Sequence, residues 1–326
     1  MSITNNSDVP LALAVWAMHD EYDFITGVEN YISVTSLMKP LRQIVIPPRI
    51  PQEKQGRADV MDFISSALGK SLHDSVEKAW TKGYADNLRA LGYPDSVIEK
   101  IVVNPAYTPS DDQIPIYLEQ RVLKKFMGFT IGGKYDLIAD GLLQDLKSTT
   151  AYTWLYGGKD DDYQLQGSLY RWLNQDKVTE DFIRINFIFT DWQKMSAKQN
   201  PKYPQKRVEY KDIPLMTVQE TENWVRAKLN QIVMHKNTPE PQLPRCTDEE
   251  LWRSAPQYKY YSKVETAQAG GRATKNFDTL VEAKTFWMVE KGGVGTVKTV
   301  PGEVKRCGYC PAFNGCTQKD EYVVAD

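Results

Sequence analysis

The segment Gly132–Ser148, GGKYDLIADGLLQDLKS, places charged residues in what otherwise has the pattern of two buried β-strands. Within it, Asp140-Gly141 is a pair typical of tight hairpin turns, and it separates two apolar runs. The sequence therefore predicts a β-hairpin. Because burying a charge costs free energy unless a partner compensates it, the hairpin must either expose its charged face or hold something that neutralises it.

The charged residues of the second strand share one side of it. Residues two apart in a strand point to the same face, so Asp145 and Lys147 project together while Leu146 points to the opposite face. Asp136 ends the preceding strand and can approach them. Converging carboxylates repel each other unless a hard cation such as Mg²⁺ joins them, and a neighbouring lysine can then orient or deprotonate a water molecule. The pattern favours phosphodiester hydrolysis, although a half-exposed sheet whose polar face meets water alternates in the same way.

Two helical patterns carry further polar residues that could join this site. On an early helix, His73 and Glu77 lie one turn apart and share a face. On a later helix, Gln166 and Tyr170 are spaced four apart, beside an apolar stripe. Taken alone, each pattern also fits a structural histidine, or a helix that exposes Gln and Tyr to solvent.

The wider pattern predicts an α/β or α+β fold, in which a helix precedes a mixed sheet that another helix interrupts. Helical periodicity covers residues 59–83, 86–102, 161–174 and 217–235, and strand signals cover residues 115–127, 129–137, 142–148, 182–191 and 207–216. We expect an N-terminal extension over residues 1–31, a core over residues 32–240 and a C-terminal lobe over residues 241–326. A chain of 326 residues is long enough to bury a core of this size.

Four motifs taken together resemble the RecB-like branch of the PD-(D/E)XK nuclease superfamily. In that branch, four motifs follow one another along the chain: a G-x-x-x-H-x-x-x-E helix, a G-x-x-D strand end, a D-x-K strand and a Q-x-x-x-Y helix. The matching residues here are, in the same order, Gly69/His73/Glu77, Gly133/Asp136, Asp145/Lys147 and Gln166/Tyr170. Residues 32–37, ISVTSL, also resemble the S-x-T-x-L opening of these domains, and the resemblance spans about residues 32–235. It implies a restriction-endonuclease-like core, a mixed β-sheet flanked by helices.

The resemblance also implies a role for each matching residue, and Mg²⁺ or Mn²⁺ as the cofactor. The metal ligands would be His73, Asp136, Asp145 and the backbone carbonyl of Leu146. Lys147 would position the attacking water, and Gln166 and Tyr170 would hold the DNA backbone or brace the lysine. Glu77 would orient the helix of the histidine, and Gln164 competes with Gln166 for the place of the family glutamine.

A second cluster of metal-binding residues lies near the C-terminus. The cysteines of the chain are Cys246, Cys307, Cys310 and Cys316. Four thiols so spaced suit tetrahedral zinc or an iron–sulfur cluster, and the spacing does not choose between them. The C-x2-C-x5-C ending resembles RecB-like nucleases that carry a [4Fe-4S] cluster, which implies a small cysteine-ligated lobe with that cluster. In those nucleases the fourth cysteine precedes the nuclease motifs. Here residues 38–42 have none and Cys246 follows the motifs, which leaves Zn²⁺ as the alternative.

Charge and hydropathy exclude several classes of protein. The net charge is −2, so a nucleic-acid partner must be held by a local patch rather than by an overall positive field. The lysine-rich segment 194–207 around Tyr203 is one candidate, and Arg121, Lys124 and Lys125 are others. The chain has no apolar run of membrane-spanning length, and its first residues lack the regions of a signal peptide. We therefore expect no membrane association and a cytoplasmic location, in a bacterium or a phage-infected host.

These features predict a Mg²⁺- or Mn²⁺-dependent deoxyribonuclease, acting as an exonuclease in DNA recombination, repair or phage DNA processing. The lack of a phosphate-binding loop of the helicase type favours a stand-alone nuclease. DNA is the expected partner, together with a recombination or single-strand-binding protein. Three alternatives stay open: a structure-specific endonuclease, a non-catalytic DNA-binding or assembly module that kept the fold, and an enzyme that hydrolyses RNA or nucleotides.

Overall fold

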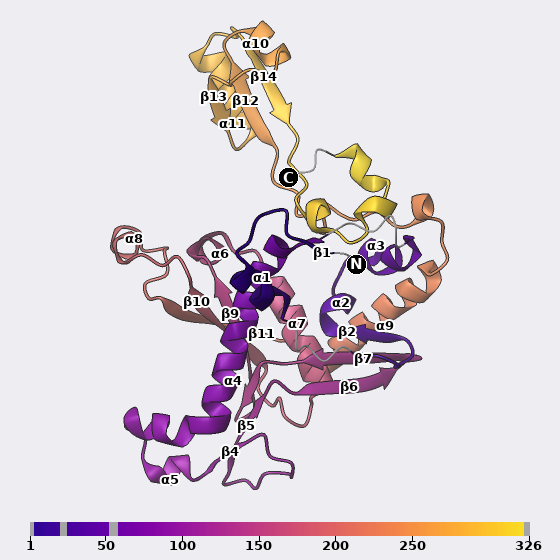
Figure 1. Ribbon diagram of the computed structural model, residues 1–326. Coiled ribbons are helices and arrows are strands. Elements are labelled where there is room, and N and C mark those ends of the chain that lie inside the picture. Colours follow the sequence, from indigo (N-terminus) through magenta and orange to yellow (C-terminus); the bar gives the residue numbers. More distant parts are fainter. Residues whose placement is uncertain (1–2, 20–24, 52–57, 323–326) are drawn as a thin grey trace. The chain divides into compact units, whose positions relative to one another are not determined.

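The structure is a computed structural model that describes residues 3–19, 25–51 and 58–322. Contacts within the chain divide it into two compact units (Figure 1). One comprises Met1–Lys39 and Arg57–Gln231, and the other comprises Pro40–Gly56 and Ile232–Asp326. A short stretch near the N-terminus therefore belongs to the unit that contains the cysteines. The domain boundaries expected near residues 31 and 240 stay predictions.

The first unit is built from short N-terminal elements, one long helix, a run of strands and several further helices, the last of which (α9) ends just beyond the unit. In chain order its elements are β1 (Ile3–Thr4), α1 (Leu11–Met18), β2 (Tyr31–Ser33), α2 (Val34–Leu37), β3 (Ala58–Asp59), α4 (Ile64–Ala90), α5 (Asp95–Ile98), β4 (Ile101–Val103), β5 (Ile114–Leu118), β6 (Arg121–Phe126), β7 (Phe129–Lys134), β8 (Leu137–Ala139), β9 (Leu142–Thr149), α6 (Ala151–Tyr156), α7 (Asp160–Leu173), β10 (Phe182–Phe189), α8 (Lys194–Gln199), β11 (Val208–Pro214) and α9 (Val218–His235).

A six-stranded mixed sheet, in the order β11-β10-β9-β8-β5-β4, forms the centre of this unit. The β9–β10 and β4–β5 pairs are parallel and the other pairs are antiparallel. A second sheet has the order β2-β7-β6, and β1 pairs with β3. A mixed sheet with flanking helices is the α/β class that the sequence predicted, so that expectation is confirmed.

Helices cover the six-stranded sheet around β9 and β10. α7 packs on the face that carries Phe187, where the ring centroid of Tyr163 lies 6.2 Å from that of Phe187. α4 passes β9 on the other side. A Cβ atom at Gly69 would lie 4.0 Å from Oγ of Ser148, and Ser148 points to the face opposite Lys147 because the two residues are adjacent in the strand. The centre of the sheet is therefore enclosed between helices.

Periodicity located most of these elements, and the exceptions have local causes. The single strand expected over residues 115–127 is two strands, β5 and β6, which belong to different sheets. They separate at Glu119, whose φ of 52° lies in the left-handed region and interrupts the strand. The expected break between helices near Gly83 does not occur, because α4 continues through that residue to Ala90. The last residues of the second expected helix, 86–102, belong instead to the strand β4 (Ile101–Val103).

The second unit contains a small antiparallel sheet in the order β13-β12-β14. Besides short 3-10 and π-helical turns, its elements are α3 (Leu41–Val45), β12 (Gln257–Tyr261), α10 (Val264–Gln268), β13 (Lys275–Phe277), α11 (Leu280–Thr285) and β14 (Thr296–Val300). Residues 247–250, TDEE, have the sequence pattern of a capping box, which predicts a helix after Cys246, but no helix forms there. Thr247 and Glu250 do exchange the two hydrogen bonds of a capping box, at 3.0 and 3.2 Å, but only a turn follows. That turn contains Trp252, whose φ of 51° is not helical.

Candidate functional site

Asp136 lies where two strands of the central sheet separate. β8 and β9 are joined by the Asp140-Gly141 turn, whose φ values of 48° and 81° suit a tight hairpin. Their pairing ends with Leu137 opposite Gln144, and beyond that pair the chain leaves β9. The freed N–H of Leu146 donates instead to Oδ2 of Asp136, at 2.8 Å. Asp136 is thereby hydrogen-bonded to β9 at Leu146, the residue between Asp145 and Lys147.

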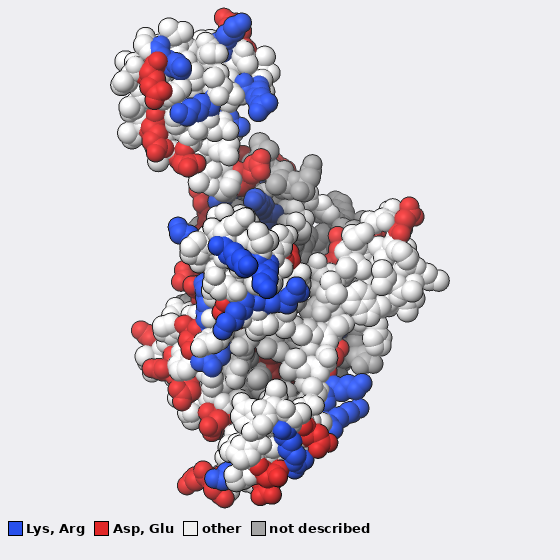
Figure 2. Space-filling view, turned by 90° about the vertical axis from the view of Figure 1, so that its left-hand side faces the viewer, with Lys and Arg blue, Asp and Glu red and all other residues white. Residues whose placement is uncertain are grey.

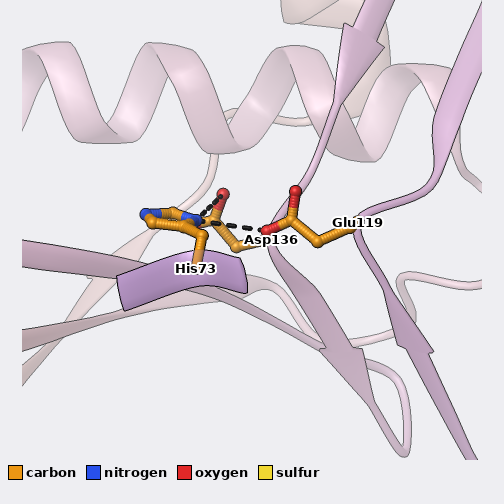
Figure 3. A group of neighbouring side chains, drawn as sticks. All are labelled: His73, Glu119 and Asp136. Carbon is orange, nitrogen blue, oxygen red and sulfur yellow. Dashed lines mark hydrogen bonds and ion pairs between the residues drawn. The ribbon is translucent and has the colours of Figure 1, made fainter. Parts of the chain in front are cut away.

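His73 reaches Asp136 from helix α4, and Glu119 joins them (Figure 3). Nδ1 of His73 lies 3.3 Å from Oδ1 of Asp136 and 3.2 Å from Oε1 of Glu119. One ligand atom from each residue lies within 4.8 Å of the other two, and all three residues are partly buried. We call these three residues the His73 group. In the part of the chain that the structure describes, it is the one set of three His, Cys, Asp or Glu side chains that approach so closely.

Glu119 is the member of this group that the sequence did not indicate. It lies at the break between β5 and β6, and its Oε2 is 2.7 Å from Nζ of Lys134. No motif or spacing marks it, because its position depends on how two separate sheets meet. An acidic residue inside an expected strand is the one signal that the sequence offers.

The charged side chains of β9 lie next to the His73 group. Nζ of Lys147 is 2.6 Å from Oδ2 of Asp145, and Nε2 of Gln166 on α7 donates to Oδ1 of Asp145 at 3.2 Å. Asp145 is 4% exposed. Its Oδ2, although ion-paired with the lysine, accepts no well-directed hydrogen bond from the described residues. Asp145 is not one of the residues within the 4.8 Å limit that defines the His73 group.

The ionisable groups of the site perturb one another's pKa values. Burial raises the pKa of Asp145 to about 6, although the charge of Lys147 opposes this. Burial lowers the pKa of Lys147, but Asp145 and Asp136 outweigh it and raise that pKa overall. The pKa of His73 is likewise lowered by burial, yet its bonds to Asp136 and Glu119 raise it to about 10. Without a metal ion, the histidine and the lysine are therefore cations that offset the carboxylates at neutral pH.

Tyr170, predicted to contact DNA or the lysine, is buried in the core instead of being open to solvent. Its ring packs against Gly133, where a Cβ atom would lie 2.6 Å from Cε1 of the ring. This close approach explains why the G-x-x-D motif has a glycine there. The role predicted for Tyr170 toward DNA stays a prediction.

The structure also separates the two candidate glutamines. Nε2 of Gln164 donates to the backbone oxygen of Pro214 at 2.8 Å, at the end of β11. Gln166 is the one that reaches Asp145, so it braces the aspartate rather than the lysine. Glu77, one turn after His73 on α4, is not part of the His73 group.

In the second unit, all four cysteines line one pocket. Cys246, Cys307, Cys310 and Cys316 surround it together with Arg42, Gln43 and other side chains. The cysteines are free thiols, and burial raises the pKa of Cys246, Cys307 and Cys310. Among the residues described, no three of the sulfur atoms lie within 4.8 Å of one another. Thiolates that share a single zinc ion lie about 3.8 Å apart, given Zn–S bonds of about 2.3 Å.

Arg42 lies beside these thiols and lines the same pocket. It is 4% exposed, it donates to Sγ of Cys316 at 3.1 Å, and it forms an ion pair with Glu240. Its remaining donors bond to the backbone oxygens of Glu240, Leu243 and Pro244.

The lysine-rich segment 194–207 is exposed, as a phosphate-binding surface must be. Lys194, Lys198, Lys202, Lys206 and Arg207 are all open to solvent. Lys and Arg side chains gather at the height of α8 on the face seen in Figure 2. Of the other candidates, Lys124 is engaged within the fold, because its Nζ lies 3.9 Å from the ring centroid of Trp172 and donates to the backbone oxygen of that residue.

No protein-family model and no curated protein matches the chain. Among solved structures, the chain is similar to SSO0001, with 15% sequence identity and a TM-score of 0.42 over 70% of this chain and 86% of that chain. It is also similar to a phage-related exonuclease from Haemophilus somnus 129PT, with 15% identity and a TM-score of 0.25 over 51% and 82% of the two chains. Scores this low do not establish a shared fold, so the assignment of the site depends on its own geometry. Within the described ranges, no helix has both the length and the apolar character needed to cross a membrane.

Proposed function

We propose that the protein is a divalent-metal-dependent deoxyribonuclease that degrades DNA from its ends. The observation that carries the proposal is the convergence of His73 from α4, Asp136 from the start of the hairpin, and Asp145 with Lys147 from β9. Their order and spacing match the RecB-like motifs. A module that only binds DNA has no need for a buried aspartate paired with a lysine beside further potential metal ligands.

The ligand set suits a hard cation. Mg²⁺ or Mn²⁺ would be held by Asp136, Asp145, the carbonyl of Leu146 and one nitrogen of His73, and Glu119 offers a further carboxylate. Oδ2 of Asp145 is a buried oxygen whose partner among the described residues is the ammonium of Lys147, and it fits a role as a ligand because it can also bind a cation. A cation bound there would polarise the scissile phosphate and neutralise the carboxylates.

The side chains around that position would prepare the reacting groups. Lys147 carries its ammonium 2.6 Å from Asp145, where it can donate a hydrogen bond to the attacking water. Gln166 fixes the orientation of Asp145 through its own hydrogen bond. The exposed lysines of segment 194–207 would contact the phosphate backbone of DNA. A recombination or single-strand-binding protein is the further partner that we propose for an enzyme of this kind.

A cleavage assay tests the proposal. The protein is incubated with end-labelled linear and covalently closed circular DNA, single- and double-stranded, in Mg²⁺, Mn²⁺ or chelator. We expect metal-dependent loss of linear DNA, and survival of closed circles if digestion starts from ends. Lys147→Ala and Asp145→Asn should each lower the rate by about 100-fold or more, with an unchanged circular dichroism spectrum.

The matched control for the lysine variant is Lys78→Ala, because Lys78 is an exposed lysine on α4 outside the His73 group. It should cleave like the wild type. Unchanged nuclease activity in both purified site variants would refute the assignment. Cleavage of closed circles would replace the exonuclease with an endonuclease.

We further propose that the four cysteines bind a [4Fe-4S] cluster rather than zinc. All four thiols line one pocket, but no three sulfurs are as close as a single zinc ion requires, in the part of the chain described. A cluster of several iron atoms spans a larger space. Anaerobically purified protein should be brown and contain iron; a colourless protein that contains only zinc would overturn this proposal.

A further inference from the structure

Helix α6 follows β9 directly and lies on the same face of the sheet as the proposed active-site side chains. Phe187 of β10 is paired with Lys147 in parallel register, so both side chains point to that face. The ring of Trp154, on α6, packs edge-on against Phe187 with 5.7 Å between the ring centroids. The helix is therefore held beside the strand position that carries Lys147.

Two hydrogen bonds fix the orientation of α6. The N–H of Ala151 donates to Oδ1 of Asp191 at 2.7 Å, and the hydroxyl groups of Thr149 and Thr153 lie 2.8 Å apart. Together with the inward-facing Trp154, these contacts prevent the helix from turning about its axis. Its opposite side therefore faces solvent.

That outer side carries two tyrosines. Tyr152 and Tyr156 are spaced four apart, which places them on the same side of the helix. They are 67% and 69% exposed. Their ring centroids are 4.7 Å apart and the ring planes are inclined by 40°. Because the rings are tilted rather than closely stacked, each keeps most of its surface open to solvent.

We propose that Tyr152 and Tyr156 form a stacking platform for unpaired nucleobases of the DNA strand that enters the site. The inference rests on the proposed nuclease function and adds the state of the substrate: a single-stranded or frayed end, rather than a fully paired one. Exposed aromatic rings hold single strands by stacking on bases, with little dependence on sequence. The charges that follow α6 are partly compensated. Among the acidic residues that begin α7, Asp160 is ion-paired with Lys211 at 3.3 Å, and Nζ of Lys211 lies 5.4 Å from the ring centroid of Trp154 on α6.

Binding measured without cleavage tests the platform. Oligonucleotides with 2-aminopurine at the terminal positions, either single-stranded or in a blunt duplex, are titrated with the protein without added Mg²⁺ or Mn²⁺. Loss of one stacking ring weakens single-strand binding by about 5- to 150-fold. The single-strand affinity of Tyr152→Ala and of Tyr156→Ala should each be weakened by a factor in that range. Each variant should also lose the quenching of 2-aminopurine fluorescence that stacking causes. Affinity for the blunt duplex should change by less than about twofold, since its bases stay paired.

Conservative and distant substitutions separate stacking from structural damage. Tyr152→Phe and Tyr156→Phe keep the ring and should bind within about twofold of the wild type. Tyr93, 52% exposed in the turn after α4, provides the matched control, and Tyr93→Ala should bind normally. The platform is refuted if the alanine variants bind single strands as tightly as the wild type, if the phenylalanine variants lose as much as the alanine variants, or if the wild type binds no single strand.

Metal-dependent cleavage is measured separately on the same preparations. A wild-type protein that binds single strands through these tyrosines but cuts no DNA would refute the proposed nuclease function and leave the platform intact. If the protein cleaves DNA normally but neither tyrosine substitution changes single-strand binding, the platform is refuted and the proposed nuclease function stands.

Discussion

At the residue scale, His73 lies between two carboxylates, and its charge state decides what else the site can hold. Burial lowers its pKa, but Asp136 and Glu119 together raise it to about 10. A histidine must lose its proton before that nitrogen can bind a metal, so a cation and a proton compete for the same place. In the metal-free protein the imidazolium does part of what a metal ion would do, because it offsets the two carboxylates.

This balance predicts how stability depends on pH. The folded-state pKa of His73 is raised above its unfolded value of about 6.5, so its contribution is fully present below that pH. The contribution is lost as the pH rises through about 10. In chelator, the difference in free energy of unfolding between the wild type and His73→Gln should therefore shrink from pH 6 to pH 10 in urea titrations. A difference that grows with pH over this range would contradict the ion pairs assigned to His73.

Glu119 is expected to support metal binding, although no motif includes it. Glu119→Gln removes a carboxylate from the His73 group and leaves Lys134 without its partner 2.7 Å away. We expect metal affinity and cleavage to fall by about 10- to 100-fold. Mn²⁺ titrations and cleavage rates measure both effects. Glu77→Gln, on α4 but outside the group, is the control and should behave almost like the wild type.

The site could be predicted from the sequence only in part, for a physical reason. Asp136, Asp145 and Lys147 lie close together because a hairpin and the alternation of a strand bring them together, and both features can be read locally. His73 could be assigned to the site only through its resemblance to a family motif, because the sequence of its own helix does not show which residues it faces. The position of Glu119 depends on how two separate sheets meet, and no local sequence pattern specifies that.

At the element scale, periodicity predicted the hairpin, the helix α7 and the strands β10 and β11 to within a few residues. These elements have one buried face, so their side-chain pattern and their position in the sheet agree. It failed where backbone conformation decided the outcome. Glu119 and Trp252 both have positive φ, and neither is a glycine that would have marked the turn.

Two glycines in these elements should respond to substitution in opposite directions. In β7, a Cβ atom at Gly133 would lie 2.6 Å from the ring of Tyr170 and 2.9 Å from Cγ2 of Val34. We expect Gly133→Ala to destabilise the protein by about 1–3 kcal/mol through overpacking. Gly83 lies inside α4, and its Cβ would meet its nearest neighbour at an ordinary 3.7 Å. Gly83→Ala should stabilise by about 0.5–1 kcal/mol. Urea unfolding measures both, and equal effects would contradict the packing at Gly133.

At the scale of the whole molecule, the second unit joins chain segments that are far apart in the sequence. Arg42 bonds to Cys316 and to three backbone oxygens of residues 240–244, and Glu240 in turn accepts hydrogen bonds from Thr317. The lobe is thus held together by an ion pair between the buried Arg42, which lines the cysteine pocket, and the partly buried Glu240. This explains why the segment Pro40–Gly56 belongs to the same unit as the cysteines.

Breaking that ion pair should destabilise the lobe. Arg42→Met leaves Glu240 without its partner, which we expect to cost about 3 kcal/mol in the free energy of unfolding. Glu240→Gln in the same chain should recover part of the loss, because no unpaired charge then remains. Urea unfolding of the single and double variants gives the coupling. Iron content measured on the same samples shows whether Arg42 also helps to retain the proposed cluster. Strict additivity of the two substitutions would contradict the role of the pair.

The central claim is that side chains from α4, the hairpin and β9 hold one divalent cation, and Mn²⁺ binding followed by electron paramagnetic resonance tests it most directly. The wild type should take up Mn²⁺, and Asp136→Asn should weaken that uptake by about 10- to 100-fold. Asp140→Asn provides the matched control, because Asp140 is exposed in the hairpin turn and asparagine tolerates its positive φ. We predict that Asp140→Asn binds Mn²⁺ like the wild type. Equal Mn²⁺ binding by the Asp136→Asn and Asp140→Asn proteins would contradict the account.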